Sequence, residues 1–223
     1  MSKIGTADIK GIMLGSTEIV KAYLGSDVVY KKGDDIVLPD GYTRLNYVEF
    51  TGTQYINTTM QPNLATDDME IDFAAVGLPT QSHICGTRTS TTQRVFTFAA
   101  NGSQWRFGFA NKTNNIDGAD MQRHVMTMQH ETGSFYIDGV LQTTIGASTL
   151  TCGYRCAVGA IAAASMYYGH VKVYRFKYRR SGELRRDMIP CINPSNVVGM
   201  YDLVLQSFFG NSGTGDIVAG EPV

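Results

Sequence analysis

Short runs in which apolar and polar residues alternate, separated by turn residues, dominate the chain, and no segment has the i, i+3, i+4, i+7 apolar stripe of a helix. The clearest hairpin joins residues 95–100 to residues 103–110 through Asn101-Gly102, a pair that accepts the two positive φ angles of a type I′ turn. Two further hairpins are predicted, over residues 134–137 and 140–144 around Asp138-Gly139, and over 170–180 and 183–189 around Ser181-Gly182. Many short strands with so little helix predict an all-β sandwich or jelly roll.

In one predicted strand the alternation of apolar and polar residues is interrupted. Over residues 171–178 the apolar side chains fall at 171 and 173, and then at 174, 176 and 178. The period of two therefore slips by one residue, so we predict a β-bulge near Val173-Tyr174. Earlier strands are expected over residues 44–50, 54–57 and 68–76.

A ten-residue repeat occupies the first thirty residues, where Ile9-Lys10 with Leu14-Gly15-Ser16 recurs as Val20-Lys21 with Leu24-Gly25-Ser26. Each copy is a β-favouring run closed by a Gly-Ser turn, which predicts a small β meander. A meander of this size buries little apolar surface, so we expect residues 1–33 to form an adaptor and residues 38–223 to form the main domain. The candidate partner-binding residues of the adaptor are Leu14, Leu24, Val29 and Tyr30.

Composition narrows the class of protein. Charged residues make up only 17% of the 223 residues, and 19 basic against 20 acidic side chains leave a net charge of -1. This balance favours no nucleic-acid partner. No apolar run approaches the ~20 residues of a membrane span, and residues 1–14 lack the pattern of a signal peptide, so neither membrane insertion nor secretion by that route is expected. The four cysteines are expected to be free thiols.

Several stretches carry a resemblance to a known group of proteins. They are residues 38–58, the hairpin at 135–139, and residues 186–191, 199–203 and 208–215. Together they resemble phage and prophage proteins built on the concanavalin A-like (laminin-G-like) sandwich, and the Leu-Gly-Ser repeat is similar to the leader of such proteins. The resemblance implies a concanavalin A-like jelly roll that serves as a non-enzymatic structural or binding component of a tailed-phage virion, such as a tail fibre, head fibre or surface decoration.

This interpretation has consequences for partners and location. It implies that the N-terminal module contacts other virion proteins, that the protein assembles in the cytoplasm of the host bacterium, and that a cell-surface glycan is a candidate ligand. Exposed sheet edges favour a homo-oligomer, with a trimer preferred to a monomer. Two alternatives stay open: a free bacterial glycan-binding, lectin-like module, and a degenerate glycoside hydrolase.

Glu70-Ile71-Asp72-Phe73 is the segment that most suggests catalysis. Laminarinase-type glycoside hydrolases share this fold and carry a second glutamate on the same strand, and a retaining mechanism needs the two carboxyl groups about 5–5.5 Å apart. The positions where that partner belongs are Ala74 and Ala75. We therefore expect no enzyme activity, and we expect Ile71 and Phe73 to point into the core.

No metal or cofactor is expected. Cys152 and Cys156 form only one close pair, and His83 with Cys85 does not complete the ligand pattern of structural zinc. The Asn- and Asp-rich segment 111–120 lacks EF-hand spacing, so an ordinary polar loop is expected there.

Aromatic residues supply the candidate glycan contacts, because the face of a Trp or Tyr suits the apolar face of a sugar while neighbouring polar groups bond its hydroxyls. The candidates are Trp105, Arg106, Tyr154, Tyr167 and Tyr168. Trp105 lies in the clearest hairpin, so a position in the core is the alternative for it.

Seven of the 19 basic residues fall on the hairpin over residues 170–189. Its candidate contacts for a partner are Lys172, Arg175, Arg179 and Arg180. The alternative is a solvated sheet edge that charge protects from pairing.

Overall fold

In a computed structural model, the chain divides into two units, residues 1–39 and residues 40–223. The structure describes residues 36–78, 82–90, 93 and 95–223, and before residue 36 only the backbone of six short strands. The described residues contain strands and no helix, so the predicted all-β class is confirmed. No helix of this part of the chain is long and apolar enough to cross a membrane.

In the part of the first unit that the structure describes, six strands pair as three two-stranded ladders, where one continuous meander was predicted. The pairs are β1 (Lys3–Ile4) with β2 (Ala7–Asp8), β3 (Met13–Leu14) with β4 (Thr17–Glu18), and β5 (Lys21–Leu24) with β6 (Asp27–Lys31).

The innermost paired residues of these ladders recur every ten residues. They are Ile4 with Ala7, Leu14 with Thr17, and Leu24 with Asp27. The repeat therefore has a third copy, which was not recognised because its sequence there is Ile4-Gly5-Thr6 instead of Leu-Gly-Ser.

Four residues of the predicted adaptor surface lie where the structure describes no side chains. They are Leu14, Leu24, Val29 and Tyr30. Their role in partner binding stays a prediction.

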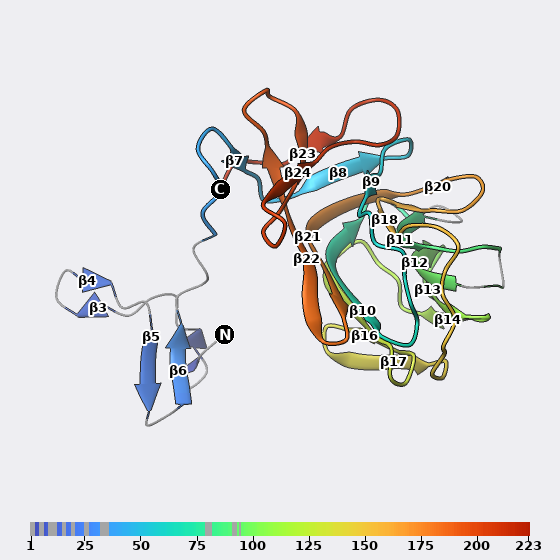
Figure 1. The fold of residues 1–223 in the computed structure, drawn as a ribbon. Coiled ribbons are helices and arrows are strands. Elements are labelled where there is room, and N and C mark those ends of the chain that lie inside the picture. Colours follow the sequence, from blue (N-terminus) through green and yellow to red (C-terminus); the bar gives the residue numbers. More distant parts are fainter. Residues whose placement is uncertain are drawn as a thin grey trace. The chain divides into compact units, whose positions relative to one another are not determined.

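The second unit is a sandwich of two antiparallel sheets (Figure 1). The larger sheet runs in the order β17 (Val140–Thr144), β16 (Ser134–Ile137), β15 (Arg123–Gln129), β10 (Asp67–Ala75), β21 (His170–Arg180), β22 (Glu183–Ile192), β23 (Val198–Asp202) and β24 (Ser207–Phe209). Short strands extend it: β7 (Thr43–Arg44) pairs with β22, β8 (Val48–Thr51) pairs with β21, and β25 (Val218–Ala219) pairs with β8.

The smaller sheet has six strands. Their order is β14 (Lys112–Asp117), β13 (Gln104–Ala110), β12 (Val95–Asn101), β11 (Ser82–Thr87), β18 (Ala157–Val158) and β9 (Ile56–Asn57). A separate ladder of β19 (Ala160–Ile161) and β20 (Tyr167–Tyr168) lies against β11.

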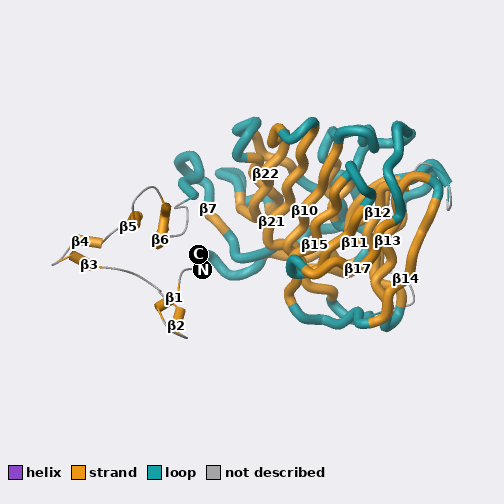
Figure 2. Tube along the Cα trace, turned by 90° about the horizontal axis from the view of Figure 1, so that it is seen from below, coloured by secondary structure: helices purple, strands orange, loops and turns teal. Residues whose placement is uncertain are grey.

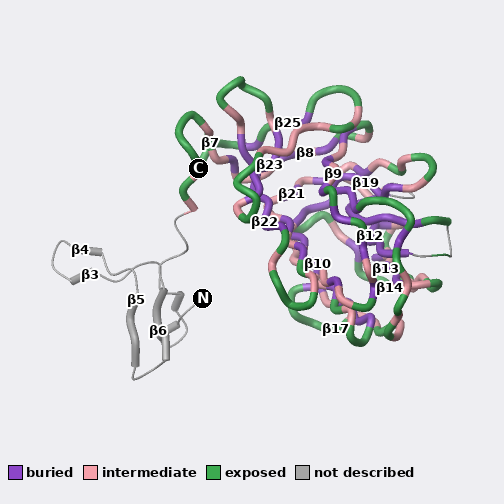
Figure 3. Tube along the Cα trace, in the orientation of Figure 1, coloured by how far each residue is buried: buried purple, intermediate pink, exposed green. Residues whose placement is uncertain are grey.

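The inner faces of the two sheets meet in one hydrophobic core, seen as buried strand segments in Figure 3. Phe73 on β10 meets Phe98 on β12, and Phe107 on β13 meets Phe135 on β16, with ring centroids 5.0 Å apart in both pairs. All four rings are fully buried. Because truncating a buried Phe to Ala typically costs about 3–5 kcal/mol, these rings are a main source of the stability of the sandwich.

The predicted bulge is confirmed. Between β10 and β21, Asp72 pairs with Arg175 while the next residue, Phe73, pairs with Val173, so Tyr174 is the extra residue. The bulge keeps Val173 and Phe176 buried on the core side.

Two of the three predicted hairpin turns are confirmed, and the third shifts by one residue. Asp138-Gly139 and Ser181-Gly182 both have positive φ at each position, as a type I′ turn requires. In the β12–β13 hairpin, however, Asn101 pairs with Gln104, so Gly102-Ser103 forms the turn instead of Asn101-Gly102. Only Gly102 has a positive φ there, which is the pattern of a type II′ turn.

The segment 111–120, expected to be a polar loop, contains the edge strand β14. Its side chains are mostly polar because it pairs on one side only, with β13. Asn114 Nδ2 donates to Thr143 Oγ1 on β17 at 2.8 Å, so a polar bond joins the edges of the two sheets.

Candidate functional site

The outer face of the larger sheet carries carboxylates along β10. Glu70 and Asp72 point outward and alternate with the buried Ile71 and Phe73, as predicted. Glu70 accepts a hydrogen bond from Lys177 Nζ at 2.7 Å, and Asp72 accepts two from Arg123, at 2.8 and 2.7 Å. Cations thus engage both carboxylates.

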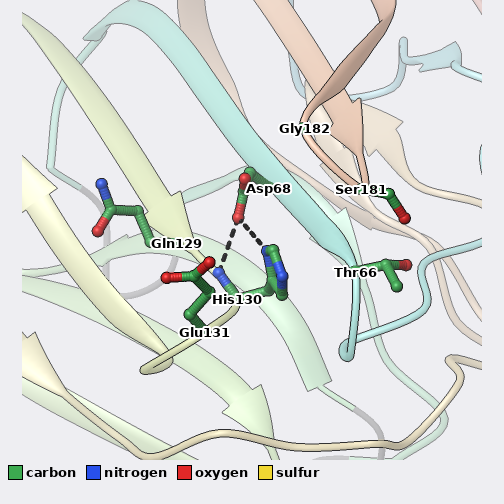
Figure 4. A pocket seen from close by; sticks show the side chains of 7 residues that line it. All are labelled: Thr66, Asp68, Gln129, His130, Glu131, Ser181 and Gly182. Carbon is green, nitrogen blue, oxygen red and sulfur yellow. Dashed lines mark hydrogen bonds and ion pairs between the residues drawn. The ribbon is translucent and has the colours of Figure 1, made fainter.

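The sheet-face groove lies beside these strands and consists of two adjoining hollows of about 580 and 180 Å³. Residues that line it are Thr66, Asp68, Met69, Glu70, Thr127, Gln129, His130, Glu131, Lys177, Arg179, Ser181 and Gly182. In Figure 4, Asp68 lies at the centre and accepts hydrogen bonds from the backbone N–H of His130 at 2.8 Å and from its Nδ1 at 2.7 Å. No aromatic side chain lines this groove among the described residues.

The structure places the predicted basic contacts mostly in ion pairs. Arg175 makes two hydrogen bonds to Asp187, at 2.7 and 2.6 Å, and Lys172 lies 3.9 Å from Glu49. Arg179 is exposed and lines the sheet-face groove. Pairing leaves much of the positive charge of this hairpin neutralised on the protein itself.

Loops connect the strands at their ends (Figure 2), and two of these loops, far apart in the sequence, build a second region. The loop after β9 and the loop before β18 run antiparallel. Thr58 N–H donates to Cys156 O at 3.0 Å, Cys156 N–H to Met60 O at 2.7 Å, and Leu64 N–H to Leu150 O at 2.8 Å. These bonds fix the two loops against each other.

These two hydrogen-bonded loops border the loop-end cleft, which consists of two hollows of about 340 and 480 Å³ that share Gln61 and Arg155. The first hollow is lined by Tyr55, Asn57, Gln61, Gly153, Tyr154, Arg155, Ala157, Ala162, Ala163 and Met166. The second is lined by Thr59, Met60, Gln61, Asn63, Thr151, Arg155 and Arg180.

The cleft combines an aromatic surface with amide groups. Tyr154 is 37% exposed, and the half-buried Tyr55 packs beside Tyr168 with ring centroids 6.3 Å apart. Asn57 Oδ1 accepts the Thr59 N–H at 2.9 Å, which leaves its amide N–H groups for a ligand. Gln61 Nε2 donates to Cys152 O at 2.8 Å, which leaves its Oε1 as an acceptor.

A buried ionic cluster supports the cleft from behind. Arg180 donates to both carboxylate oxygens of Asp67, at 2.8 and 2.7 Å, and to the Gln61 carbonyl at 2.7 Å. Asp67 also accepts from the Tyr178 hydroxyl and from Asn63 N–H. Burial by itself would raise the pKa of Asp67, but the bonds from Arg180, Asn63 and Tyr178 outweigh it and hold that pKa below its usual value. The cluster therefore ties β21 to the loop that carries Gln61.

One of the predicted glycan contacts lines the cleft, and a second packs against a residue of its lining. Tyr154 lines the cleft and Tyr168 packs against its Tyr55. Tyr167, next on β20, stacks under the guanidinium of Arg88 at 4.0 Å and contacts the ring of His83.

The other two predicted contacts lie elsewhere. Trp105 is 3% exposed and packs against Phe73 and Phe98, so it belongs to the core, the alternative given for it. Its ring offers no platform to a ligand. Arg106 follows Trp105 on β13 and points to the opposite face of the sheet, so the two cannot form one site.

Several residues of the cleft were not predicted from the sequence. Tyr55 and Asn57 lie within the stretch that carries the family resemblance, but Gln61 and Arg155 belong to no motif. Gln61 bonds to Cys152, 91 residues further along the chain, and Thr58 bonds to Cys156, 98 residues further along. Only the fold brings the two loops together.

All four cysteines are buried thiols, as expected. Burial raises the pKa of Cys191 to about 12. Burial likewise raises the pKa of Cys156, with a smaller effect from Cys152. The described residues contain no cluster of three or more His, Cys, Asp or Glu side chains arranged to hold a metal ion.

Comparison with known proteins places the fold. No protein-family model and no curated protein matches the chain. Among solved structures, the chain is similar to a Bacteroides ovatus protein for which carbohydrate binding has been suggested, with a TM-score of 0.56 and 10% identity, covering 81% of this chain. The chain spans 62% of the length of that protein. At this identity the likeness shows a shared β-sandwich fold and nothing further.

Trypanosoma rangeli sialidase is also matched, alone and in complex with the inhibitor DANA. Both structures give a TM-score of 0.40 and 18% identity over 52% of this chain and 21% of the sialidase.

Proposed function

We propose that the second unit binds carbohydrate and does not catalyse a reaction, that is, that it is a lectin-like module. The shared fold with the Bacteroides ovatus protein supports this proposal. The observation that carries it is the loop-end cleft, where the exposed Tyr154 ring lies among the amide groups of Asn57 and Gln61.

The chemistry of the cleft suits a sugar. A tyrosine ring covers the apolar C–H face of a pyranose, while amide N–H and C=O groups bond its hydroxyls. The two hollows fall within the range of about 300–1,000 Å³ that is usual for small-ligand sites. Because the loops are already bonded to each other, little ordering entropy opposes binding.

Absence of catalysis is part of the same proposal. The carboxylates of β10 are held by Lys177 and Arg123, and buried alanines occupy positions 74 and 75. A retaining glycosidase needs one free carboxylate and a protonated partner at close range. Neither Glu70 nor Asp72 is set up in that way.

The test is glycan-array screening of the full chain, followed by calorimetry with the best ligand. Tyr154→Ala is expected to weaken binding by about five- to thirteenfold, since stacking on an aromatic ring contributes on the order of 1–1.5 kcal/mol. Tyr136→Ala is the matched control, because Tyr136 lies on the outer face of the larger sheet, opposite Thr127 of the sheet-face groove. Loss of binding on Tyr136→Ala with none on Tyr154→Ala would transfer the site to that groove. The absence of any glycan ligand would overturn the proposal.

A second candidate function, a structural component of a tailed-phage virion, is favoured by one observation. The three short ladders of the first unit recur every ten residues and belong to a unit separate from the sandwich. Short paired strands offer free edges to another chain. On this proposal the first unit attaches the sandwich to other virion proteins or to its own copies, and the sandwich contacts a glycan on the host surface.

A further inference from the structure

The loop-end cleft carries a positive charge that the protein does not balance. Arg155 is exposed and lines both hollows. Within the described part of the chain, no carboxylate or hydrogen-bond acceptor contacts its guanidinium, and no Asp or Glu lines either hollow. Arg180, the other cation of the lining, is neutralised by Asp67 at 2.7 Å.

Two arginines on the outer face of the larger sheet do have carboxylate partners. On the outer face of the larger sheet, Arg123 pairs with Asp72 at 2.7 Å and Arg175 pairs with Asp187 at 2.6 Å. The lack of a carboxylate partner among the described residues distinguishes Arg155 from these two arginines. It leaves all five N–H donors of Arg155 available, in the planar fork that fits a carboxylate or sulfate.

The side of the molecule next to the cleft is also cationic. Burial, and then the charges of Arg88 and Arg106, lower the pKa of His83 to about 4. His83 contacts Tyr167, whose neighbour Tyr168 packs against Tyr55 of the cleft. An anionic ligand entering the cleft therefore approaches a region of positive potential, which favours its association.

We propose, on the basis of the carbohydrate-binding function above, that the ligand is an acidic glycan whose carboxylate or sulfate group binds Arg155. The sugar ring that carries the acid stacks on Tyr154, and its hydroxyls reach Asn57 and Gln61. A neutral sugar leaves the Arg155 fork without its best partner, so the acidic group sets the specificity of the cleft.

The experiment measures binding of the full chain to two matched pairs of oligosaccharides. Oligogalacturonate against its methyl ester tests a carboxylate, and carrageenan oligosaccharides against neutral agaro-oligosaccharides test a sulfate. The variants are Arg155→Gln and Arg155→Lys, with Arg185→Gln as control. Arg185 is likewise exposed but pairs with Glu183 near the tip of the β21–β22 hairpin.

The expected result is that one acidic member binds at least tenfold more tightly than its neutral counterpart. Arg155→Gln removes that preference, Arg155→Lys retains part of it, Arg185→Gln leaves it unchanged, and added salt weakens binding of the acidic member only. The acidic pair that responds identifies the group as carboxylate or sulfate.

Three results would overturn the inference. Equal binding of acidic and neutral members refutes the acidic specificity but leaves carbohydrate binding intact. An acidic preference that persists in Arg155→Gln assigns the anion to another surface. Failure of these oligosaccharides together with every glycan of the array removes the proposed function itself.

Discussion

Two buried ionisable side chains of the sandwich differ in how the protein satisfies them. Asp67 is fully buried yet ionised, because donors from Arg180, Tyr178 and a backbone N–H surround its carboxylate. His83 is 6% exposed and faces positive charge, so the fold keeps its ring neutral. A buried charge is tolerated only where partners replace the lost water.

His83 makes the stability of the sandwich depend on pH. Its pKa in the folded protein is about 4, against about 6.5 in an unfolded chain. Between these values the unfolded state binds more protons, so stability falls as the pH drops through that window, by up to about 3 kcal/mol. His83→Gln removes this contribution. Urea unfolding at about pH 7, 5.5 and 4.5 should therefore give a flatter pH dependence for the variant. Parallel curves for both proteins would contradict the assignment.

At the scale of the element, β10 shows how position along one strand sets the importance of an ion pair. Asp67, at its start, is bonded to Arg180 and is fully buried. Asp72, five residues on, pairs with an Arg123 side chain that is 57% exposed. The two pairs have the same chemistry and the same 2.7 Å separation, but only the first is shielded from solvent.

Neutralising these two aspartates should therefore have unequal effects. Asp67→Asn leaves Arg180 without its counter-charge and is expected to cost roughly 3–5 kcal/mol of unfolding free energy. Asp72→Asn is expected to cost at most ~1 kcal/mol, because solvent screens an exposed pair. Chemical denaturation of both variants against the wild type measures the difference. Equal, small losses would show that the buried cluster does not stabilise the strand.

Elements whose own pattern encodes their shape were predictable from the sequence. The bulge at Tyr174 and the turns at Asp138 and Ser181 follow from alternation and from residues that tolerate positive φ. The position of the turn after β12 could not be predicted in this way, because Ser103 O accepts hydrogen bonds from the N–H groups of Gly118 and Ala119, at 3.0 and 2.9 Å. This is a tertiary contact, which the local sequence around the turn does not predict.

Some residues of the candidate site could likewise be predicted from the sequence, and others could not. Tyr154 could be proposed from its residue type, because an exposed aromatic ring in a polar loop suggests a sugar platform. Trp105 satisfied the same criterion and lies in the core, since residue type alone does not give the inward or outward register. Gln61 and Arg155 can be recognised as site residues only in the structure, where the paired loops bring them into the lining of one cleft.

At the scale of the whole molecule, the second unit is closed by the residues at its two chain ends. Asn46 N–H donates to Glu221 O at 2.9 Å, and Val223 N–H donates to Arg44 O at 3.1 Å. Ile217 is 4% exposed and part of the core. Residues 1–39 form a unit of their own. The sandwich thus depends on its last residues, and the described residues of its core lie between Leu45 and Ile217.

Two deletions test this division. Removal of residues 1–35 is expected to leave the melting temperature within ~2 °C of the full chain and to leave glycan binding intact, because the core loses no residue. Removal of residues 217–223 should lower it by at least about 5 °C, since losing a buried Ile typically costs 2–5 kcal/mol and the pairing of β25 with β8 is lost as well. Calorimetry measures the melting temperature of both deletion variants.

If the first unit attaches the protein to other virion proteins or to its own copies, removal of residues 1–35 also abolishes particle association or oligomer formation, which sedimentation measures. Unfolding on removal of residues 1–35 would make them part of the sandwich and end the adaptor proposal. A folded product that still assembles would place the attachment surface on the sandwich, where the hairpin of β21 and β22 carries seven of the 19 basic residues.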